Sequence, residues 1–260
     1  AQQYMDFGVA NGYQTREGFN NIWDGTTDTD WGSEVFVPTW SQKHTVGFQG
    51  GNDNGNLFVS INDVDNNGIF KGDKDVYKRL SIQINADYKI KKWLTIGTNN
   101  SIEKWSTSSV SQQNDNGSAM LAAITSSPLF PVSCTYDALP TDVKNKASNH
   151  KILQDPDNPG MYWSLPTETQ SSNPFVQRDA TDSNSGGINV RGVAYMNLTP
   201  FRGFTYTSRF GYRISQNTQH IYTEPYYANS FVNSDVYTIS TRANTGYYYQ
   251  WENFINYEKT

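Results

Sequence analysis

The chain has 260 residues, of which 36% are hydrophobic and only 17% are charged, and it is rich in Tyr, Phe and Trp. Aromatic residues favour β-strands, and its many Asn and Gly residues favour turns. The net charge of −5 argues against a nucleic-acid partner, because phosphate neutralisation requires clustered Lys and Arg. The single cysteine, Cys134, excludes an internal disulfide. No apolar run reaches the length of a transmembrane helix, about 18 residues, but alternating barrel strands are not excluded.

Seven segments are predicted to be β-strands. The clearest is Leu80–Ile90, in which apolar or aromatic residues alternate with Ser, Gln, Asn, Asp and Lys over the whole segment. Alternation with period two gives a strand with one apolar and one polar face. In chain order the predicted strands are His44–Gly51, Gly55–Asp63, Leu80–Ile90, Trp93–Ser106, Ile188–Leu198, Phe204–Ile214 and Gly246–Glu258.

Two of these strands carry informative interruptions. In Phe204–Ile214, Arg209 and Arg213 fall on the polar face, while Ser208 interrupts the apolar one. The position of the arginines matters in a bilayer, where an Arg on the lipid face near the midplane costs about 2–4 kcal/mol. The apolar face of Trp93–Ser106 also carries Thr98, Asn100 and Lys104.

The connections between the strands alternate in length. Short turns are expected at Gly50–Gly55, Lys91-Lys92 and Thr199–Arg202, and long links at Val64–Lys78, Thr107–Gly187 and Thr218–Thr245. Short turns at one end of a sheet and long loops at the other are typical of outer-membrane barrels. The sequence therefore predicts an all-β fold of antiparallel up-and-down strands.

The alternative is a soluble or secreted β-sandwich that binds carbohydrate or mediates adhesion. A sandwich would bury the apolar strand faces between two sheets. Two features favour the membrane barrel instead. Tyr and Trp lie at strand ends, as at bilayer interfaces, and a loop as long as Thr107–Gly187 is uncommon in a compact soluble domain.

A series of segments carries a family resemblance. They are Asp28–Phe36, Ser41–Gly51, Asn56–Ile69, Tyr77–Arg79, Lys92–Gly97, Ser126–Pro131, Asn173-Pro174, Leu198–Tyr206 and Trp251–Lys259. In order and spacing they resemble the SusC/RagA family of TonB-dependent outer-membrane transporters. Ser126–Pro131 resembles a helical stretch in one of that family's outer loops.

The resemblance implies a fold and a location. The chain is expected to form part of a 22-stranded, plugged β-barrel that crosses the bacterial outer membrane many times. Residues 1–43 would be an extracellular loop region, and residues 44–260 a partial barrel with a long outer loop at about 107–187. The plug domain is absent, and seven strands leave open edges that lipid cannot satisfy. The sequence is therefore expected to be a piece of a larger protein.

The resemblance also implies a function: TonB-dependent import of glycans, oligosaccharides or similar large nutrients. The chain would supply barrel wall and loops that face the ligand and a lid. The implied partners are a SusD-like surface lipoprotein, the TonB complex acting through the missing plug segment, a glycan or peptide ligand and the lipid bilayer. Such a transporter needs no cofactor and is not an enzyme.

Metal and catalytic sites are weakly indicated. Asp63–Gly68 resembles the opening of an EF-hand calcium loop, but the twelfth position is Lys74 and not Glu, which favours a plain Asn/Gly loop. Adjacent aspartates such as Asp28 and Asp30 favour turns over glycoside hydrolysis. No zinc-site spacing joins the three histidines, His44, His150 and His220.

Aromatic residues of the outer loops are the candidate substrate-binding residues. Flat rings offer an apolar face to sugar C–H groups, while neighbouring Asn, Asp and Gln side chains bond hydroxyls. The alternative for each ring is loop packing or anchoring at the bilayer interface. The candidates are Trp23, Trp31, Trp105, Tyr136, Tyr162, Trp163, Tyr226 and Tyr227.

Overall fold

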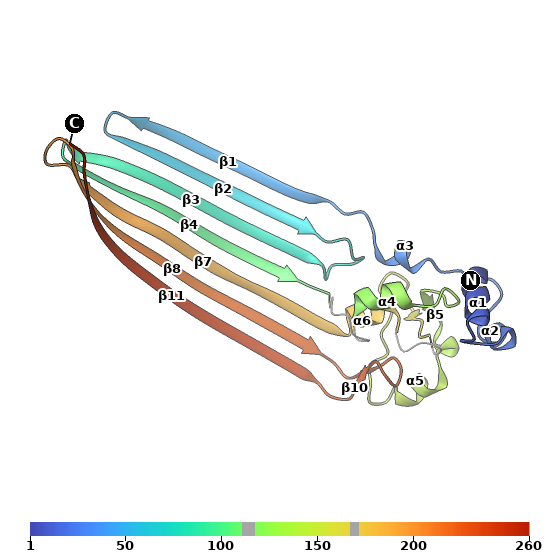
Figure 1. Cartoon of the computed structure of the whole chain (residues 1–260). Coiled ribbons are helices and arrows are strands. Elements are labelled where there is room, and N and C mark those ends of the chain that lie inside the picture. The colour runs from blue at the N-terminus through green and yellow to red at the C-terminus, as the bar shows by residue number, and fades with distance from the viewer. Residues whose placement is uncertain (111–117, 167–171, 260) are drawn as a thin grey trace.

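The computed structural model describes residues 1–110, 118–166 and 172–259. Its main feature is one long, curved antiparallel sheet, with helices and short strands gathered at one end (Figure 1). The seven strands follow one another in the order β1-β2-β3-β4-β7-β8-β11, which confirms the predicted all-β, up-and-down arrangement, in a sheet that is not closed. The strands are β1 (Ser41–Asn52), β2 (Gly55–Asn67), β3 (Val76–Lys91), β4 (Leu94–Ser108), β7 (Thr181–Leu198), β8 (Phe204–Thr223) and β11 (Thr238–Tyr257).

The connections at the two ends of the sheet differ in length, as predicted. At one end the strands are joined by residues 53–54, 92–93 and 199–203. At the other end they are joined by residues 68–75, 109–180 and 224–237 (Figure 1). Within the predicted long loop, residues 111–117 and 167–171 lie outside the described residues.

The strands are longer than predicted at the end with the long connections. β7 begins at Thr181 and not at Ile188, and β8 continues to Thr223 beyond Ile214. These extensions consist mostly of polar residues on both faces, so they show no clear alternation, yet backbone hydrogen bonds pair them as well as the rest. The stretch that resembles a calcium loop, Asp63–Gly68, also belongs mostly to a strand extension and not to a loop. Its residues 63–67 form the end of β2 and pair with residues 76–80 of β3.

The segments outside the sheet form a cap on this end, comprising the described residues of 1–40, 68–75, 109–180 and 224–237. In place of a predicted loop, the N-terminal part contains three helices, two of which begin at capping side chains, Thr15 and Asp30. None of the helices in the described residues is long and apolar enough to cross a membrane. The cap elements are α1 (Gln2–Ala10), α2 (Arg16–Ile22), α3 (Trp31–Val35), α4 (Ala119–Thr125), β5 (Ser133–Cys134), η1 (Tyr136–Ala138), α5 (Thr141–Lys146), β6 (Tyr162–Trp163), α6 (Pro174–Asp179), β9 (Tyr226–Tyr227) and β10 (Asn233–Ser234).

One predicted helix is misplaced. Ser126–Pro131 was expected to be helical, but α4 ends at Thr125, immediately before this stretch. Pro128 and Pro131 explain the difference, because the residue before a proline is disfavoured in the α conformation and proline supplies no backbone donor.

The buried core lies in the cap and not in the sheet. Every buried hydrophobic side chain of the described residues belongs to the cap, and none belongs to the seven long strands. On the sheet, Ile82 and Ile84 are only half-buried and Phe210 is exposed. A β-sandwich would enclose these residues between two layers, so the sandwich alternative does not fit this single-layered sheet.

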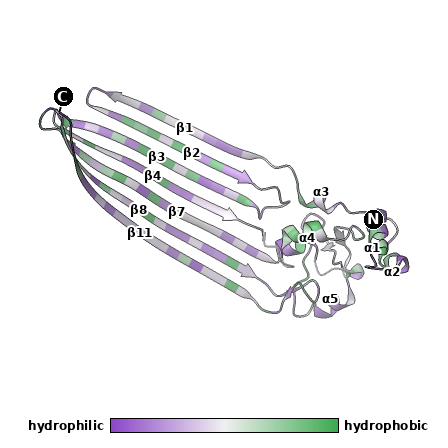
Figure 2. Cartoon of the chain, in the orientation of Figure 1, coloured by the Kyte–Doolittle hydropathy of each residue, from purple (hydrophilic) through white to green (hydrophobic). Residues whose placement is uncertain are grey.

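The strand register aligns the apolar residues of all seven strands on one face. Ile82, for example, lies directly between Ile61 on β2 and Ile102 on β4. Figure 2 shows hydrophobic and hydrophilic residues alternating along the long strands. We call this the apolar face and the opposite side the polar face. Residues of the apolar face include Val46, Phe48, Leu57, Val59, Ile61, Leu80, Ile82, Ile84, Tyr88, Ile90, Leu94, Ile96, Ile102, Val190, Ala194, Met196, Leu198, Tyr206, Phe210, Tyr212, Ile214, Tyr247, Tyr249, Trp251 and Ile255.

Four of the polar side chains that interrupt this face are hydrogen-bonded within it. Two of the bonds come from aromatic donors to the positions that break the alternation of β8 and β4. Trp251 Nε1 donates to Ser208 Oγ at 3.0 Å, and Tyr212 Oη donates to Asn100 Oδ1 at 2.7 Å. The other bonds run from Tyr206 Oη to Asn253 Oδ1, from Asn100 Nδ2 to Thr98 Oγ1 and from Thr98 Oγ1 to the Val193 carbonyl. A surface that lies away from water requires such internal partners.

Gly192 makes the bond between Tyr212 and Asn100 possible, because the Tyr212 ring crosses above it. A Cβ atom at Gly192 would lie 2.2 Å from Asn100 Oδ1 and 2.7 Å from Tyr212 Cζ. We therefore expect Gly192→Ala to break this bond and to lower the free energy of unfolding by about 1–3 kcal/mol, measured by denaturant titration in detergent micelles. Gly211→Ala is the matched control, since its nearest neighbours lie at 3.9 Å. The control should be neutral or stabilising by up to about 1 kcal/mol, and equal losses in both variants would contradict the prediction.

Candidate functional site

The polar face carries two pairs of oppositely charged residues. Arg209 on β8 lies opposite Glu252 on β11, with 3.9 Å between Nη1 and Oε2. Arg79 on β3 lies 3.8 Å from Glu103 on β4. The sequence placed Arg209 on this face correctly, because alternation alone determines the side on which a strand residue lies.

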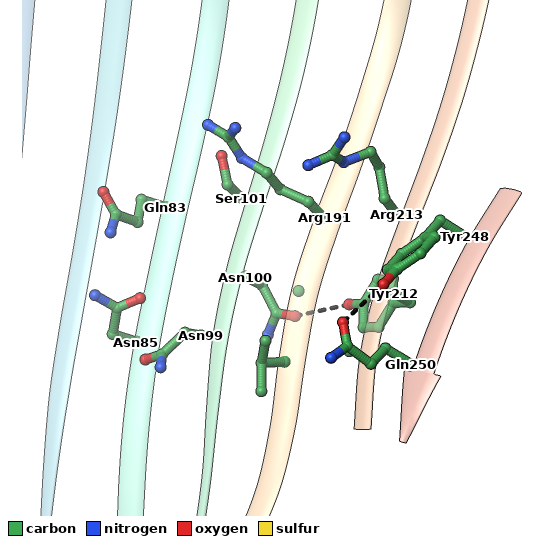
Figure 3. Close-up of a pocket in the computed structure, with 13 residues that line it drawn as sticks. Gln83, Asn85, Asn99, Asn100, Ser101, Arg191, Tyr212, Arg213, Tyr248 and Gln250 are labelled. Carbon is green, nitrogen blue, oxygen red and sulfur yellow. Dashed lines mark hydrogen bonds between the residues drawn. The ribbon is translucent and has the colours of Figure 1, made fainter. Parts of the chain in front are cut away.

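A hollow of about 370 Å³ lies in the middle of the polar face (Figure 3). Its wall is rich in amides and hydroxyls and contains two guanidinium groups. Hydrogen bonds within the wall join Tyr248 Oη to Gln250 Oε1 and, from the far side of the sheet, Tyr212 to Asn100. The lining residues are Gln83, Asn85, Asn99, Asn100, Ser101, Arg191, Gly192, Val193, Gly211, Tyr212, Arg213, Tyr248 and Gln250.

The register explains the shape of this hollow. Two neighbouring rows of cross-strand partners form it, one through Arg191 and Arg213 and the next through Val193 and Gly211. Val193 and Gly211 are small, so the second row forms a low floor beside the long arginine side chains. The hollow therefore combines a shallow apolar floor with a polar rim, an arrangement that suits a ligand with several hydrogen-bonding groups.

Four of the eight predicted aromatic residues lie in one region of the cap as two linked pairs, which we call the tyrosine cluster. Tyr136 and Tyr162 form an edge-to-face pair with ring centroids 5.7 Å apart. Tyr226 and Tyr227 form β9, and residues 151–154 connect the two groups by bridging to Tyr226 at one end and to Tyr162 at the other. Tyr136 is exposed, and the other three rings are half-buried.

Tyr227 has the most polar surroundings of these rings. Its Oη donates to Asp142 Oδ2 at 3.3 Å, and the His150 ring packs edge-on at 6.1 Å. Lys146 Nζ lies 5.7 Å from the ring centroid. Burial raises the pKa of Tyr227, and the nearby Asp142 carboxylate raises it further, so the hydroxyl is held as a hydrogen-bond donor.

Two other candidates are packing residues. Trp31 and Trp163 are 4% and 3% exposed and belong to the core of the cap. Trp163 stacks on Phe175 with centroids 4.7 Å apart and donates from Nε1 to Asp179. Neither ring offers a free face to a ligand in this structure. Loop tryptophans look alike in sequence whether they pack or bind.

The remaining two candidates lie apart from the tyrosine cluster. Trp23 is half-buried beside the separate small core of Met5, Phe19 and Leu129. Trp105 lies on the polar face of β4 near the cap, directly opposite Gly187. The structure therefore does not bring the eight predicted residues into one site. The central hollow was missed, because the sequence gives no register between β4 and β7.

A second hollow, of about 420 Å³, lies within the cap. Its wall is largely apolar, with Asp24 as the one charged group among the described residues that line it. Burial raises the pKa of Cys134, which also lines it. Asp24 itself is committed to a turn, because it accepts hydrogen bonds from Thr27 Oγ1 and from the backbone N–H groups of Thr26 and Thr27. The list of lining residues is Ile22, Asp24, Leu129, Phe130, Pro131, Cys134, Ala138, Pro140, Ser164 and Leu165.

The turn at Asp24 leads to a pH prediction. The bond from the Thr27 side chain, followed by those from the two backbone N–H groups, lowers the pKa of Asp24 from 3.8 to about 2. A lowered pKa means that the turn is fully stabilised above pH 3.8 and loses this contribution as the pH falls through about 2. We expect an NMR titration of the carboxyl group to give this midpoint and Thr27→Val to raise it. Thr26→Val is the control, because Thr26 contributes mainly through its backbone; an Asp24 midpoint near 3.8 in the unmodified protein would refute the prediction.

A metal site is not indicated in the part of the chain that the structure describes. No group of three or more His, Cys, Asp or Glu residues there is arranged to hold an ion. The arrangement instead offers binding surfaces: a polar hollow on the sheet and a tyrosine cluster in the cap.

Comparisons with known proteins identify a likeness of fold. No protein-family profile and no curated protein sequence matches the chain. Among solved structures, the RagAB peptide importer in its "open-open" state matches with a TM-score of 0.69 and 17% identity, and in its "closed-closed" state with 0.70 and 18%; each match covers 98% of this chain and 29% of that chain. A structure of the RagAB peptide transporter matches with a TM-score of 0.63 and 20% identity over 91% of this chain and 24% of that chain. This chain thus spans less than a third of the chains that it resembles.

Proposed function

We propose that the chain forms part of the wall of a TonB-dependent importer of large nutrients in the bacterial outer membrane. The apolar face would contact lipid, and the polar face would line a watery lumen. The observation that carries the proposal is the combination of exposure and internal hydrogen bonding on the apolar face. It is exposed, with Trp251 72% and Phe48 63% accessible, yet its interrupting polar groups at Thr98, Asn100 and Ser208 are bonded within the face. A face open to water would gain little from such pairing, whereas in hydrocarbon it is required.

The dimensions of the apolar face support this placement. The apolar stretch Leu80–Ile90 spans about 33 Å along β3 at a rise of about 3.3 Å per residue. A strand tilt of about 40° reduces this height to about 25 Å, the height of the apolar band of outer-membrane barrels. Exposed aromatic rings at the end with short turns, at Tyr88, Trp93, Phe201 and Tyr257, fit an interfacial girdle.

The substrate is proposed to be an oligopeptide or a glycan. The resemblance of the sequence to the SusC/RagA family and the fold shared with RagAB peptide importers support a large nutrient. In the cap, the Tyr136–Tyr162 pair and Tyr227 offer rings and hydroxyls to such a ligand. Import needs capture and a conformational change, and it requires no covalent chemistry by this chain.

The partners are proposed to be a SusD-like surface lipoprotein above the cap and the TonB complex acting through a plug segment. The cap carries exposed apolar side chains, Phe7, Tyr13, Ile124 and Phe231, which a lid protein would cover. Phe7 and Tyr13 also contact each other, with ring centroids 6.2 Å apart.

Uptake by cells tests the proposed function. Cells that express the full-length protein should accumulate fluorescent oligopeptides or oligosaccharides, and cells lacking the gene should not. A protonophore that collapses the inner-membrane gradient should abolish the difference, because TonB-driven transport depends on that gradient. Equal uptake by both strains for both classes of compound would refute the proposal, and uptake that is insensitive to the protonophore would refute its TonB dependence.

A further inference from the structure

Two arginines lie side by side in the middle of the polar face. Arg191 on β7 and Arg213 on β8 are direct partners in the strand register. Directly opposed residues of an antiparallel pair have Cα atoms only about 4.5–5.5 Å apart, and like charges in these positions repel each other. Figure 3 shows both side chains on the same face, with the Arg191 guanidinium reaching toward Ser101.

The other arginines near them on this face have acidic neighbours. Arg209 and Arg79 lie near Glu252 and Glu103, as described above. These glutamates are also held by amides, because Gln250 donates to Glu252 and Asn189 donates to Glu103. Within residues 1–110, 118–166 and 172–259, neither Arg191 nor Arg213 has a carboxylate within 4.0 Å or a hydrogen bond to a side chain. The sheet thus places two adjacent cations without the anion that accompanies Arg79 and Arg209.

An unpartnered acceptor lines the same hollow. Asn85 Oδ1 is buried and has no hydrogen-bond partner among the described residues. Asn85 belongs to the row next to the arginines, and the low floor of Val193 and Gly211 lies in that row. On one side of the hollow, the guanidinium groups of Arg191 and Arg213 lack an anion. In the neighbouring row, Asn85 Oδ1 lacks a hydrogen-bond donor. Buried polar groups without partners are uncommon in folded proteins and indicate an absent ligand or water.

We propose that this hollow is a binding site for a carboxylate group, which Arg191 and Arg213 hold between them. Each planar guanidinium can present two parallel N–H groups to carboxylate oxygens, so one carboxylate relieves the repulsion of both. The proposal rests on the proposed function in one respect, that the polar face lines a lumen reached by solutes. Where the carboxylate belongs to a solute, the site adds a selectivity: a solute with a free carboxylate, such as an oligopeptide C-terminus or a uronate, binds here in preference to its neutral counterpart.

The carboxylate has two possible sources, the imported solute or an acidic side chain elsewhere in the protein. A matched pair of probes separates them, N-acetyl-trialanine with a free C-terminal carboxylate and the same peptide as its C-terminal amide. Binding of both is measured by calorimetry on the full-length protein in detergent, together with the midpoint of thermal unfolding without any probe. The variants are Arg191→Gln, Arg213→Gln, their combination and the double Lys variant. Arg209→Gln is the control, because it removes an arginine of the same face that already has a carboxylate.

A solute carboxylate predicts that the unmodified protein binds the acid form at least tenfold more tightly than the amide. Each Gln substitution should weaken binding of the acid about tenfold, and the combination should abolish the preference. The double Lys variant should keep part of it, because Lys retains the charge but not the fork. Without probe, the Gln variants should unfold at the same temperature as the unmodified protein or higher, since repulsion is relieved.

A carboxylate from the protein itself predicts the opposite pattern. The two peptides would bind equally, and the combined Gln variant would unfold at a lower temperature without any probe, by more than Arg209→Gln does. If the peptides bind equally and the combined variant is as stable as the unmodified protein or more so, the pair holds no carboxylate and the proposal is overturned. That result would not affect the importer proposal. The importer proposal fails only if the cells show no uptake that depends on the protein, or if an arginine on the apolar face does not destabilise the protein.

Discussion

Substitution of Ile82 by arginine is expected to lower the free energy of unfolding in lipid bilayers by about 2–4 kcal/mol. Ile82 lies in the middle of the apolar face, between Ile61 and Ile102 on the neighbouring strands. Both neighbours are apolar, so a guanidinium at this position would find hydrocarbon and no counter-charge. The effect is measured by denaturant titration of the full-length protein refolded into vesicles, with the folded fraction read from its altered gel mobility.

The adjacent residue provides the matched control. Ser81 precedes Ile82 and points to the polar face, where its direct partner on β4 is Glu103. Ser81→Arg introduces the same side chain one position away, and the change should stay within about 0.5 kcal/mol. If both variants are tolerated equally, the apolar face does not contact hydrocarbon, and the importer proposal fails with it.

Removal of the Phe175 ring is expected to cost the cap about 3–5 kcal/mol, the usual loss for a fully buried Phe replaced by Ala. Phe175 is 0% exposed. It stacks on Trp163 and meets the Phe70 ring edge-on at 6.4 Å. The Arg178 guanidinium also lies 4.9 Å from its centroid. Phe175 therefore joins α6 to the segment between β2 and β3, and its loss should loosen the cap as a unit.

The sheet should survive this change, because its strands are held by their own ladder and bury no hydrophobic side chain in the cap core. Hydrogen exchange followed by mass spectrometry should show faster exchange across residues 119–166, with β3, β4 and β7 unchanged. Tyr136→Ala is the control, because Tyr136 is 41% exposed and contributes little to the core. Simultaneous loss of protection in cap and strands would contradict this separation of cap and sheet.

The central parts of the strands were predictable from the sequence, and their ends were not. Leu80–Ile90 alternates without a break, and the structure places all of it within β3. The polar start of β7, Thr181–Gly187, has no apolar face, so no periodic signal separates it from a loop. The N-terminal helices were also missed, although Thr15 and Asp30 as capping residues are the kind of signal that marks a helix start.

The candidate site was predictable only in part, because it depends on register. Arg213 was assigned to the polar face from alternation alone. Its partner Arg191 lies on another strand, and nothing in the sequence shows that the two face each other. The same limitation applies to Asn100, which interrupts the apolar alternation of β4. Its hydrogen-bond partner, Tyr212, lies on β8, and the sequence alone does not show that the two residues meet. The aromatic candidates of the cap divide into packing and accessible residues, a division that requires knowledge of burial.

The interruption of the sheet between β4 and β7 has a kinetic consequence. The hairpins β1–β2, β3–β4 and β7–β8 are closed by turns of two to five residues, whereas β4 and β7 meet only after residues 109–180 have been accommodated. Closing a long loop costs more conformational entropy than closing a tight turn, and it is therefore slower. During assembly the two halves of the sheet should therefore form early as separate units, and zippering of β4 onto β7 should await compaction of the intervening segment.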